Sequence, residues 1–333
     1  MNRLTKSKKA VFVTGGAGYV GAHCCKVFSK AGWNVVVYDN LSRGWADFVK
    51  WGPLIEGDIL DRERLFASIK SVKPDAVAHF AAFAYVGESV SHPDKYYRNN
   101  VVGSLNLLDA MTASEVENIV FSSTCATYGN PHYLPIDEAH PQSPINPYGR
   151  SKLMVEQILK DYSDAFGIRS VALRYFNAAG ADPDGEIGER HEPETHLIPL
   201  ALRGAGDADY TLNILGDDYE TRDGSAIRDY IHVMDLADAH LRALYYLGEG
   251  GGTTQINLGT GRGTSVIEIQ KAVERMTQHD VRARTAPRRP GDPAVLVSSP
   301  TLANQILGWA PHFSSVDNLI HDAWNWHKKQ DAF

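Results

Sequence analysis

The sequence predicts an α/β fold, a doubly wound parallel sheet of the Rossmann type with a smaller mixed α/β C-terminal domain. Short unbroken apolar runs alternate with helical periodicity, and a glycine-rich loop joins the first run to the first helix. Apolar strands that alternate with helices are typical of a parallel sheet covered on both faces. The chain becomes rich in Gly, Pro, Asp and Glu after about Asn177. We therefore expect a Rossmann domain over residues 1–177 and mainly a substrate domain over 178–333, with segments near 229–260 returning to the first.

The predicted elements follow the apolar pattern along the chain. Gly32 ends the first helix at the position expected of a C-terminal cap. Residues 179–194 are too polar for a central strand and are expected to form loops. The expected strands are 11–13, 34–38, 54–55, 76–80, 119–122, 171–175 and 255–258, and the expected helices are 20–31, 62–71, 99–114, 148–166 and 235–247.

Composition excludes several classes of protein. The 333 residues are 43% apolar and 22% charged, which argues for a globular chain, and a net charge of −7 argues against a nucleic-acid partner. The sequence offers no apolar run long enough for a membrane span. We therefore expect a cytoplasmic location and no membrane partner. Three cysteines (Cys24, Cys25 and Cys125) suit a reducing compartment and show no zinc spacing, so no metal is expected.

The glycine loop at residues 14–21 is the first chemical signal. It follows a predicted strand, opens a predicted helix and satisfies the G-x-x-G-x-x-G pattern with Gly15, Gly18 and Gly21. Glycines let the backbone approach a pyrophosphate, and the helix N-terminus attracts its charge. Asp39 ends the next strand, where a carboxylate accepts hydrogen bonds from an adenosine ribose and repels a 2′-phosphate. NAD is therefore the expected cofactor, although Arg43 nearby leaves NADP open.

Tyr148 and Lys152 are the second signal. Asn146 and Pro147 start the helix, so the tyrosine and lysine lie one turn apart on the same face. A neighbouring ammonium and a positively charged nicotinamide both favour the phenolate, and two such close cations in a dry site predict that the pKa of Tyr148 falls toward about 7. Hydroxyls at 122–124 end a predicted strand at the edge where ligands bind.

With these motifs the sequence resembles the extended short-chain dehydrogenase/reductases and, more narrowly, the UDP-glucose 4-epimerase family. The likeness runs from about Ala10 to Trp326. It is carried by the glycine loop, the Tyr-x-x-x-Lys pair and the stretches Asp39-Asn40-Leu41, Gly57-Asp58-Ile59, His79-Phe80-Ala81, Val86-Gly87-Glu88-Ser89, Pro147–Glu156, Arg174-Tyr175-Phe176-Asn177, Arg228–Val233 and Pro287-Arg288-Arg289.

The resemblance implies interconversion of UDP-galactose and UDP-glucose through a transient 4-keto intermediate, with bound NAD. It implies that Tyr148 takes the proton of the 4-hydroxyl, that Thr124 hydrogen-bonds the same oxygen and that Lys152 anchors the nicotinamide ribose. The implied cofactor contacts are Gly15, Gly18, Tyr19, Val20, Gly21, Asp39, Asn40, Asp58, Ile59, Phe80, Ala81, Ala82, Asn99, Ser122, Tyr148, Lys152 and Tyr175. The implied substrate contacts are Thr124, Tyr148, Asn177, His196, Leu197, Arg228, Tyr230, Arg289, Asp292 and Leu296.

Departures from the family pattern leave the sugar open. Ala84 stands where many members place a lysine beside the cofactor, which predicts weaker retention of NAD. Leu296 is intermediate between the tyrosine and the smaller residues that narrow or widen the sugar pocket, so UDP-N-acetylglucosamine is an alternative substrate. Residues 81–86 and 123–128 also resemble epimerases of UDP-xylose and UDP-arabinose.

Two other functions on this scaffold are disfavoured. A sugar-nucleotide 4,6-dehydratase needs an acid and a base after the threonine, where this chain has Cys125 and Ala126. A non-catalytic NAD-sensing protein would not need the intact Tyr148 and Lys152 pair. The predicted helices 99–114 and 148–166 carry more apolar positions than one sheet face uses, and the resemblance implies that they pair in a homodimer.

Overall fold

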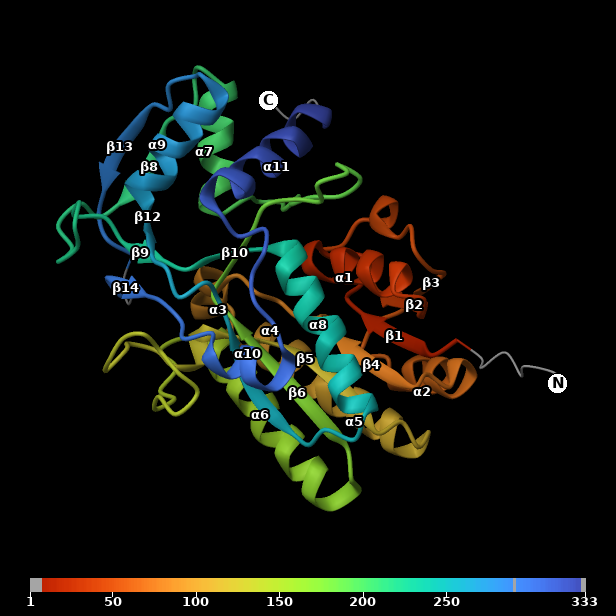
Figure 1. The fold of residues 1–333 in the computed structure, drawn as a ribbon. Helices are drawn as coiled ribbons and strands as arrows, with labels where there is room; N and C mark the ends of the chain where they lie inside the picture. The colour runs from red at the N-terminus through yellow and green to blue at the C-terminus, as the bar shows by residue number, and fades with distance from the viewer. Residues whose placement is uncertain (1–7, 290–291, 331–333) are drawn as a thin grey trace.

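A seven-stranded parallel sheet forms the centre of the larger part of the chain (Figure 1). The computed structural model describes residues 8–289 and 292–330. The order of the strands reverses between β1 and β4, which makes the carboxyl ends of these two strands a ligand-binding switch point. In spatial order the strands are β11 (Thr254–Leu258), β6 (Arg169–Tyr175), β5 (Asn118–Thr124), β4 (Ala76–His79), β1 (Ala10–Thr14), β2 (Asn34–Asp39) and β3 (Leu54–Glu56).

Helices cover both faces of this sheet and give it two apolar cores. Side chains alternate between the faces: in β1, Val11 and Val13 point to one core and Phe12 to the other, and the residues of β2 alternate in the same way, so each strand contributes to both cores. One face is covered by α1 (Tyr19–Lys30), α8 (Val233–Gly248) and α10 (Thr301–Leu307), and the other by α2 (Arg62–Val72), α5 (Gly103–Ala113) and α6 (Pro147–Phe166). The predicted doubly wound fold is confirmed.

The predicted helix at 99–114 begins earlier than expected. Helical turns start at α4 (Pro93–Tyr96), where Pro93 occupies the first helical position, and continue through a π-helical stretch (Tyr97–Val102) into α5. The short helix α3 (Val86–Ser91) precedes them. Proline begins this run because its missing amide hydrogen costs nothing in a first turn.

The smaller part of the chain has its own core. It consists of helices around short strands: α7 (Leu197–Gly206), α9 (Val266–Thr277), α11 (Val316–Lys329), and β8 (Leu212–Leu215) paired with β13 (Ala283–Ala286). Three further short strands form a second small sheet, β12 (Thr264–Ser265), β9 (Ile227–Arg228) and β14 (Val295–Leu296), and β7 (Asn177–Ala179) pairs with β10 (Tyr230–His232).

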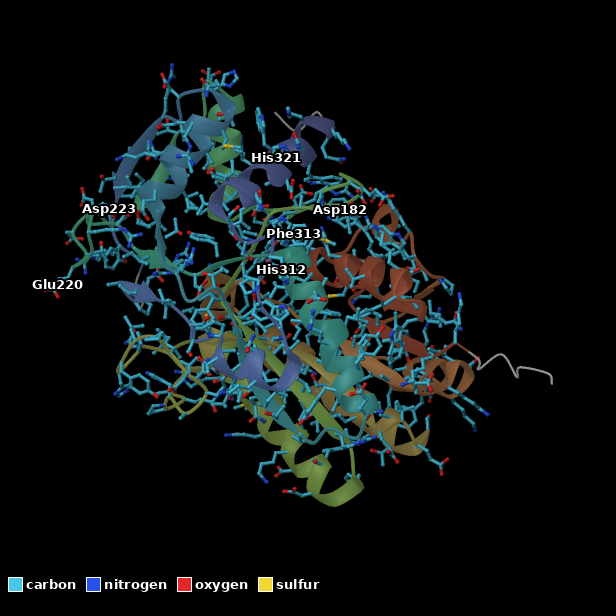
Figure 2. All side chains as sticks on the ribbon, viewed as in Figure 1. Asp182, Glu220, Asp223, His312, Phe313 and His321 are labelled. Atoms are coloured by element: carbon cyan, nitrogen blue, oxygen red, sulfur yellow. The ribbon has the colours of Figure 1, made fainter. Side chains whose placement is uncertain are left out.

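The two parts interleave in sequence. Of the segment near 229–260, α8 packs on the sheet and β11 joins its edge, and residues 301–309 also return to this side through α10 and Trp309. The first turn of α8 holds the chain that leads to α11, because Asp235 accepts hydrogen bonds from the amides of His312 and Phe313 at 2.8 and 2.9 Å. His312 and Phe313 are labelled in Figure 2. Within the described ranges, no helix has both the length and the apolar character to cross a bilayer.

Candidate active site

The glycine loop has no room for side chains. Gly15 has φ +73°, and a Cβ there would lie 2.5 Å from the amide nitrogen of Ala81, which follows β4. A Cβ on Gly21 would lie 2.2 Å from the Gly15 carbonyl oxygen. Both glycines are therefore needed to bring the loop, the start of α1 and the end of β4 together at the switch point.

The start of α1 is open to an anion. Gly18 is its N-cap and makes no side-chain capping bond, and a Cβ there would touch only the Gly15 carbonyl oxygen, at 3.4 Å. The amides of Tyr19, Val20 and Gly21 form the first turn, where amides have no intrahelical acceptor. The Tyr19 hydroxyl does not point its hydrogen toward the anion, because it donates this hydrogen to the Gly180 carbonyl at 2.6 Å. These residues fit the pyrophosphate of a dinucleotide.

The end of β2 positions a carboxylate beside this loop. Asp39 accepts hydrogen bonds from the amides of Ala17 (3.0 Å) and Leu41 (2.8 Å). Burial raises the pKa of Asp39, and the two amide hydrogen bonds lower it. Asn40 donates to Asp58 at 2.9 Å, so the ends of β2 and β3 meet at one edge.

Arg43 is engaged elsewhere. Its guanidinium lies 3.2 Å from the carboxylate of Glu88, donates to the Glu192 carbonyl at 2.8 Å and stacks on the Tyr85 ring. A 2′-phosphate would have to compete with Glu88 for this cation. The arrangement therefore favours NAD over NADP.

The other cofactor candidates lie along the same edge of the sheet. Phe80, Ala81 and Ala82 directly follow β4, and the hydroxyls of Ser122 and Tyr175 at the ends of β5 and β6 hydrogen-bond to each other. Asn99 is buried and donates to Asn100 at 3.0 Å. Ile59 packs in the core beside α5.

Tyr148, Lys152 and Thr124 meet beyond the ends of β5 and β6. Asn146 caps α6 by accepting from the Gly149 amide at 2.8 Å, as the sequence predicts. The Lys152 ammonium is buried and donates to the Ser122 carbonyl at 2.8 Å, above the Phe121 ring. Thr124 hydrogen-bonds the Tyr148 side chain and also accepts from the Ala126 amide at 3.1 Å.

Burial acts against charge on both members of this pair. It raises the pKa of Tyr148 to about 12, and the hydrogen bond with Thr124 opposes that shift. Burial also lowers the pKa of Lys152 to about 7, although Glu156 acts in the opposite direction. The predicted lowering of the tyrosine pKa depends on the nicotinamide cation as well as on Lys152, so it stays a prediction for the NAD-bound enzyme.

A buried polar network supports β5 and α6 from behind. The Glu156 carboxylate accepts from the Ser123 hydroxyl and from Arg174, whose guanidinium nitrogens lie 2.6 to 3.2 Å from it. Arg174 also donates to the Tyr128 hydroxyl at 2.8 Å. Glu156 thus fixes both the strand that carries Thr124 and the helix that carries Tyr148 and Lys152.

A second group of predicted residues meets at β9, β14, β7 and β10. Arg228 and Leu296 are paired across β9 and β14, and Asn177 and Tyr230 are paired across β7 and β10. The Arg228 guanidinium lies 2.5 Å from the carboxylate of Asp292. Leu296 packs against the cluster that contains Cys125 and Phe176, which follow β5 and β6. This links the second group to Thr124.

Three predicted substrate residues are less closely tied to this group. Arg289 is exposed, while its neighbour Arg288 pairs with Asp218 at 2.6 Å and stacks on Tyr219. His196 caps the start of α7 just before Leu197, and its ring contacts Glu189.

The sequence did not single out Tyr219 or Cys125. The charges of Arg228, Asp292 and Arg288 act on the pKa of the Tyr219 hydroxyl. The charge of Arg228 also lowers the pKa of the Cys125 thiol, against the larger effect of burial. An isolated tyrosine after two aspartates carries no motif, so only the fold brings it to this group.

Fold and site together define a dinucleotide-dependent enzyme of Rossmann type, with a tyrosine and lysine pair at the carboxyl edge of its parallel sheet. Residues 11–259 match the model of the NAD dependent epimerase/dehydratase family, and the chain belongs to this family. Its cofactor is NAD.

The relatives share nearly the whole chain. A UDP-glucose 4-epimerase of Rhizobium meliloti (strain 1021) is 52% identical over 96% of this chain and 98% of its own. The crystal structure of UDP-glucose 4-epimerase from Brucella ovis in complex with NAD is 53% identical, with a TM-score of 0.93, over 95% of this chain and 97% of that one. A UDP-glucose-4-epimerase of Stenotrophomonas maltophila with bound NAD and formylated UDP-arabinopyranose is 39% identical, with a TM-score of 0.93, over 97% of this chain and 99% of that one.

Proposed function

We propose that the chain is a UDP-glucose 4-epimerase, an NAD-dependent isomerase that interconverts UDP-galactose and UDP-glucose. One observation carries the proposal: Tyr148, Lys152 and Thr124 meet at the strand edge onto which the glycine loop opens. High identity over nearly the full length of named 4-epimerases supports the same conclusion.

The reaction requires a base at the sugar 4-hydroxyl. The Tyr148 Oη takes this proton, and Thr124, which hydrogen-bonds Tyr148, holds the same oxygen in line. When bound, NAD would supply reversible hydride acceptance at C4 and a positive charge that favours the phenolate. On return, the same tyrosine gives its proton to the C4 oxygen, so no proton or electron pair is gained or lost.

The nucleotide must stay bound while the sugar turns. Arg228 suits a diphosphate because its planar guanidinium donates two charge-assisted hydrogen bonds, and the paired Asp292 lies beside it to accept from a ribose hydroxyl. Asn177, Tyr230, Arg289, His196 and Leu197 complete the proposed nucleotide contacts. Leu296 faces the sugar from β14.

Leu296 also bears on which sugars are accepted. Its side chain is only partly buried and packs against the apolar cluster that contains Cys125 and Phe176. A leucine leaves more space than a tyrosine, which favours UDP-N-acetylglucosamine as a second substrate. The UDP-linked pentose held by the Stenotrophomonas maltophila relative supports a pentose as another.

An equilibrium assay tests the proposal. UDP-galactose, UDP-N-acetylgalactosamine and UDP-xylose are incubated side by side with the purified protein, with and without added NAD, and the 4-epimers are separated by chromatography. We expect conversion of UDP-galactose to be fastest. Faster conversion of either other sugar would move the assignment to that sugar, and no inversion at C4 of any of them would refute the function.

We also propose a cytoplasmic homodimer that pairs through α5 and α6. Met154 is 40% exposed and Phe166 is 57% exposed, although Val155 and Leu159 of the same helix are in the core. We expect sedimentation at about twice the chain mass, and Met154→Glu with Phe166→Glu should shift it toward the monomer. Sedimentation of the wild type as a monomer at micromolar concentration would contradict the pairing.

A further inference from the structure

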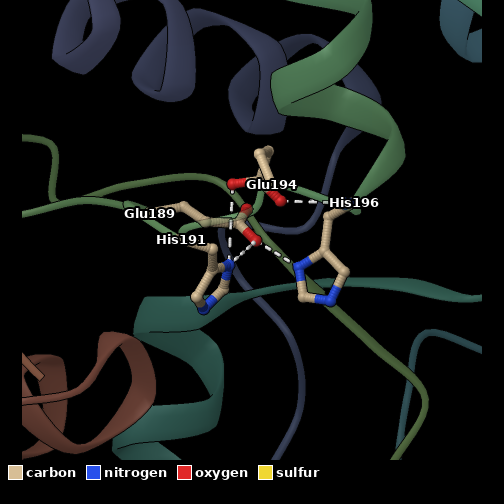
Figure 3. Close-up of side chains that lie close together, drawn as sticks. All are labelled: Glu189, His191, Glu194 and His196. Atoms are coloured by element: carbon tan, nitrogen blue, oxygen red, sulfur yellow. Dashed lines mark hydrogen bonds and ion pairs between the residues drawn. The ribbon is translucent and has the colours of Figure 1, made fainter. Parts of the chain in front are cut away.

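Four metal-ligating side chains converge on the loop that leads to α7. Glu189, His191, Glu194 and His196 each offer one nitrogen or oxygen atom, and these four atoms all lie within 4.8 Å of one another (Figure 3). They come from eight consecutive residues, so the fold of one loop makes the cluster. The glycine loop, the tyrosine and lysine pair and the expected nucleotide contacts other than His196 do not use it.

Two ligand-atom distances inside the cluster suit a tetrahedral divalent cation. With metal–ligand bonds of about 2.0 Å, neighbouring ligand atoms in a tetrahedral zinc site lie about 3.3 Å apart. The His191 Nδ1 lies 3.2 Å from a Glu189 oxygen and 3.5 Å from a Glu194 oxygen. The His196 Nδ1 contacts the same Glu189 oxygen. A set of two imidazoles and two carboxylates favours the binding of zinc over that of magnesium or calcium.

Two of these ligands are already held in place. The other Glu194 oxygen accepts hydrogen bonds from the amides of Thr195 (2.7 Å) and His196 (2.8 Å), which fixes the carboxylate as outer hydrogen bonds do in metal sites. The Nδ1 of His191 points between the two carboxylates at ion-pair distance, but in the described residues its geometry to them is poor for a hydrogen bond. A metal bond would satisfy that nitrogen.

A nearby acidic cluster shows what a filled site looks like. Asp182 (labelled in Figure 2), Asp184 and Glu186 surround the buried ammonium of Lys26 at 2.6, 2.8 and 2.5 Å. Within residues 8–289 and 292–330, no lysine or arginine forms such an ion pair with Glu189 or Glu194. A cavity of about 470 Å³, lined by Glu189, His191 and Glu194 among others, gives an ion a way in.

We propose that Glu189, His191, Glu194 and His196 form a binding site for a transition-metal dication, with Zn²⁺ as its best-matched ligand. The site binds one ion per chain. The site lies next to α11, because the indole of Trp326 on this helix donates a hydrogen bond to the Glu189 backbone carbonyl at 3.1 Å. Metal binding of this kind stabilises the folded state by mass action.

Zinc binding by the holoenzyme tests the site. Equilibrium dialysis against Zn²⁺ with elemental analysis measures stoichiometry and affinity, and Co²⁺ as a probe reports the coordination geometry by its visible absorption. We expect one Zn²⁺ per chain, an absorption typical of tetrahedral Co²⁺, and affinity at least about tenfold weaker in His191→Gln and in Glu194→Gln. Asp184→Asn, in the cluster filled by Lys26, is the matched control and should bind Zn²⁺ as the wild type does.

The outcomes separate the metal site from its alternatives. Circular dichroism and turnover of UDP-galactose show that each variant is folded, and neither His191 nor Glu194 has been assigned to the reaction. If the wild type binds no Zn²⁺ saturably, or if both variants bind it as tightly as the wild type, the cluster is a set of histidine–carboxylate ion pairs and the proposal is wrong. Loss of turnover in the wild type would bear on the proposed function and not on this binding.

Discussion

Tyr148→Phe is expected to lower kcat by about 10²–10⁴-fold, the usual contribution of a positioned acid–base group. The ring of Tyr148 lies edge-on to that of Tyr96, with centroids 6.4 Å apart, and phenylalanine keeps this contact. Only the Oη and its hydrogen bond with Thr124 are lost. NAD should therefore still bind, while the proton at the sugar 4-hydroxyl has no acceptor.

The measurement is the initial rate with UDP-galactose, beside NAD affinity by fluorescence titration. Tyr246→Phe is the matched control, because the Tyr246 hydroxyl only accepts from the Gly252 amide, at 3.2 Å, and lies on α8. It should leave kcat unchanged. A Tyr148→Phe enzyme that works within about threefold of the wild type would remove the tyrosine from the chemistry.

The parts of this site that can be read from sequence are those made by residues close along the chain. The glycine loop sits between its own strand and helix, and one helical turn aligns Tyr148 with Lys152. Arg228 and Asp292 are 64 positions apart, and no periodicity relates them. Only the family resemblance predicted that they belong to one site.

Other features depend on the folded surroundings. The sequence analysis expected no metal from its cysteine spacings, and it did not weigh the two histidines and two glutamates of the proposed site before α7, which only a folded loop brings within 4.8 Å. The burial that raises the pKa of Tyr148 in the absence of cofactor cannot be known from Tyr148 and Lys152 alone. The polar network around Glu156 joins four separate segments, so no local pattern predicted it.

Lys152→Met is expected to abolish turnover and at the same time to stabilise the fold near neutral pH. The Lys152 ammonium is 3% exposed, and burial lowers its pKa from 10.5 to about 7, so the folded state disfavours its charge. Methionine is similar in length and carries no charge. We expect the free energy of unfolding to rise by about 2–4 kcal/mol near pH 6, with cofactor removed from both proteins.

The pH dependence of this gain has a definite sign. Below about pH 7 the lysine is protonated in both states, and the wild type carries the whole cost of burying the charge. Between about 7 and 10.5 the unfolded chain binds more protons at this position than the folded one, so wild-type stability rises with pH relative to that of Lys152→Met. The stability difference between the two proteins should therefore shrink steadily toward about pH 10.

Urea unfolding near pH 6, 8 and 10 measures this difference, and initial rates with UDP-galactose measure turnover. Lys160→Met on the same helix is the control, because the Lys160 ammonium is exposed and pairs with Asp164 at 2.7 Å. Its effect on stability should stay within about 1 kcal/mol. If Lys152→Met were less stable than the wild type near pH 6, the hydrogen bond to the Ser122 carbonyl would outweigh the desolvation of the ammonium. A gain that did not change with pH would mean that folding does not lower the pKa of Lys152. A stable but inactive variant would instead mean that the enzyme keeps a buried charge at the expense of stability, because Lys152 must stand beside Tyr148 for the reaction.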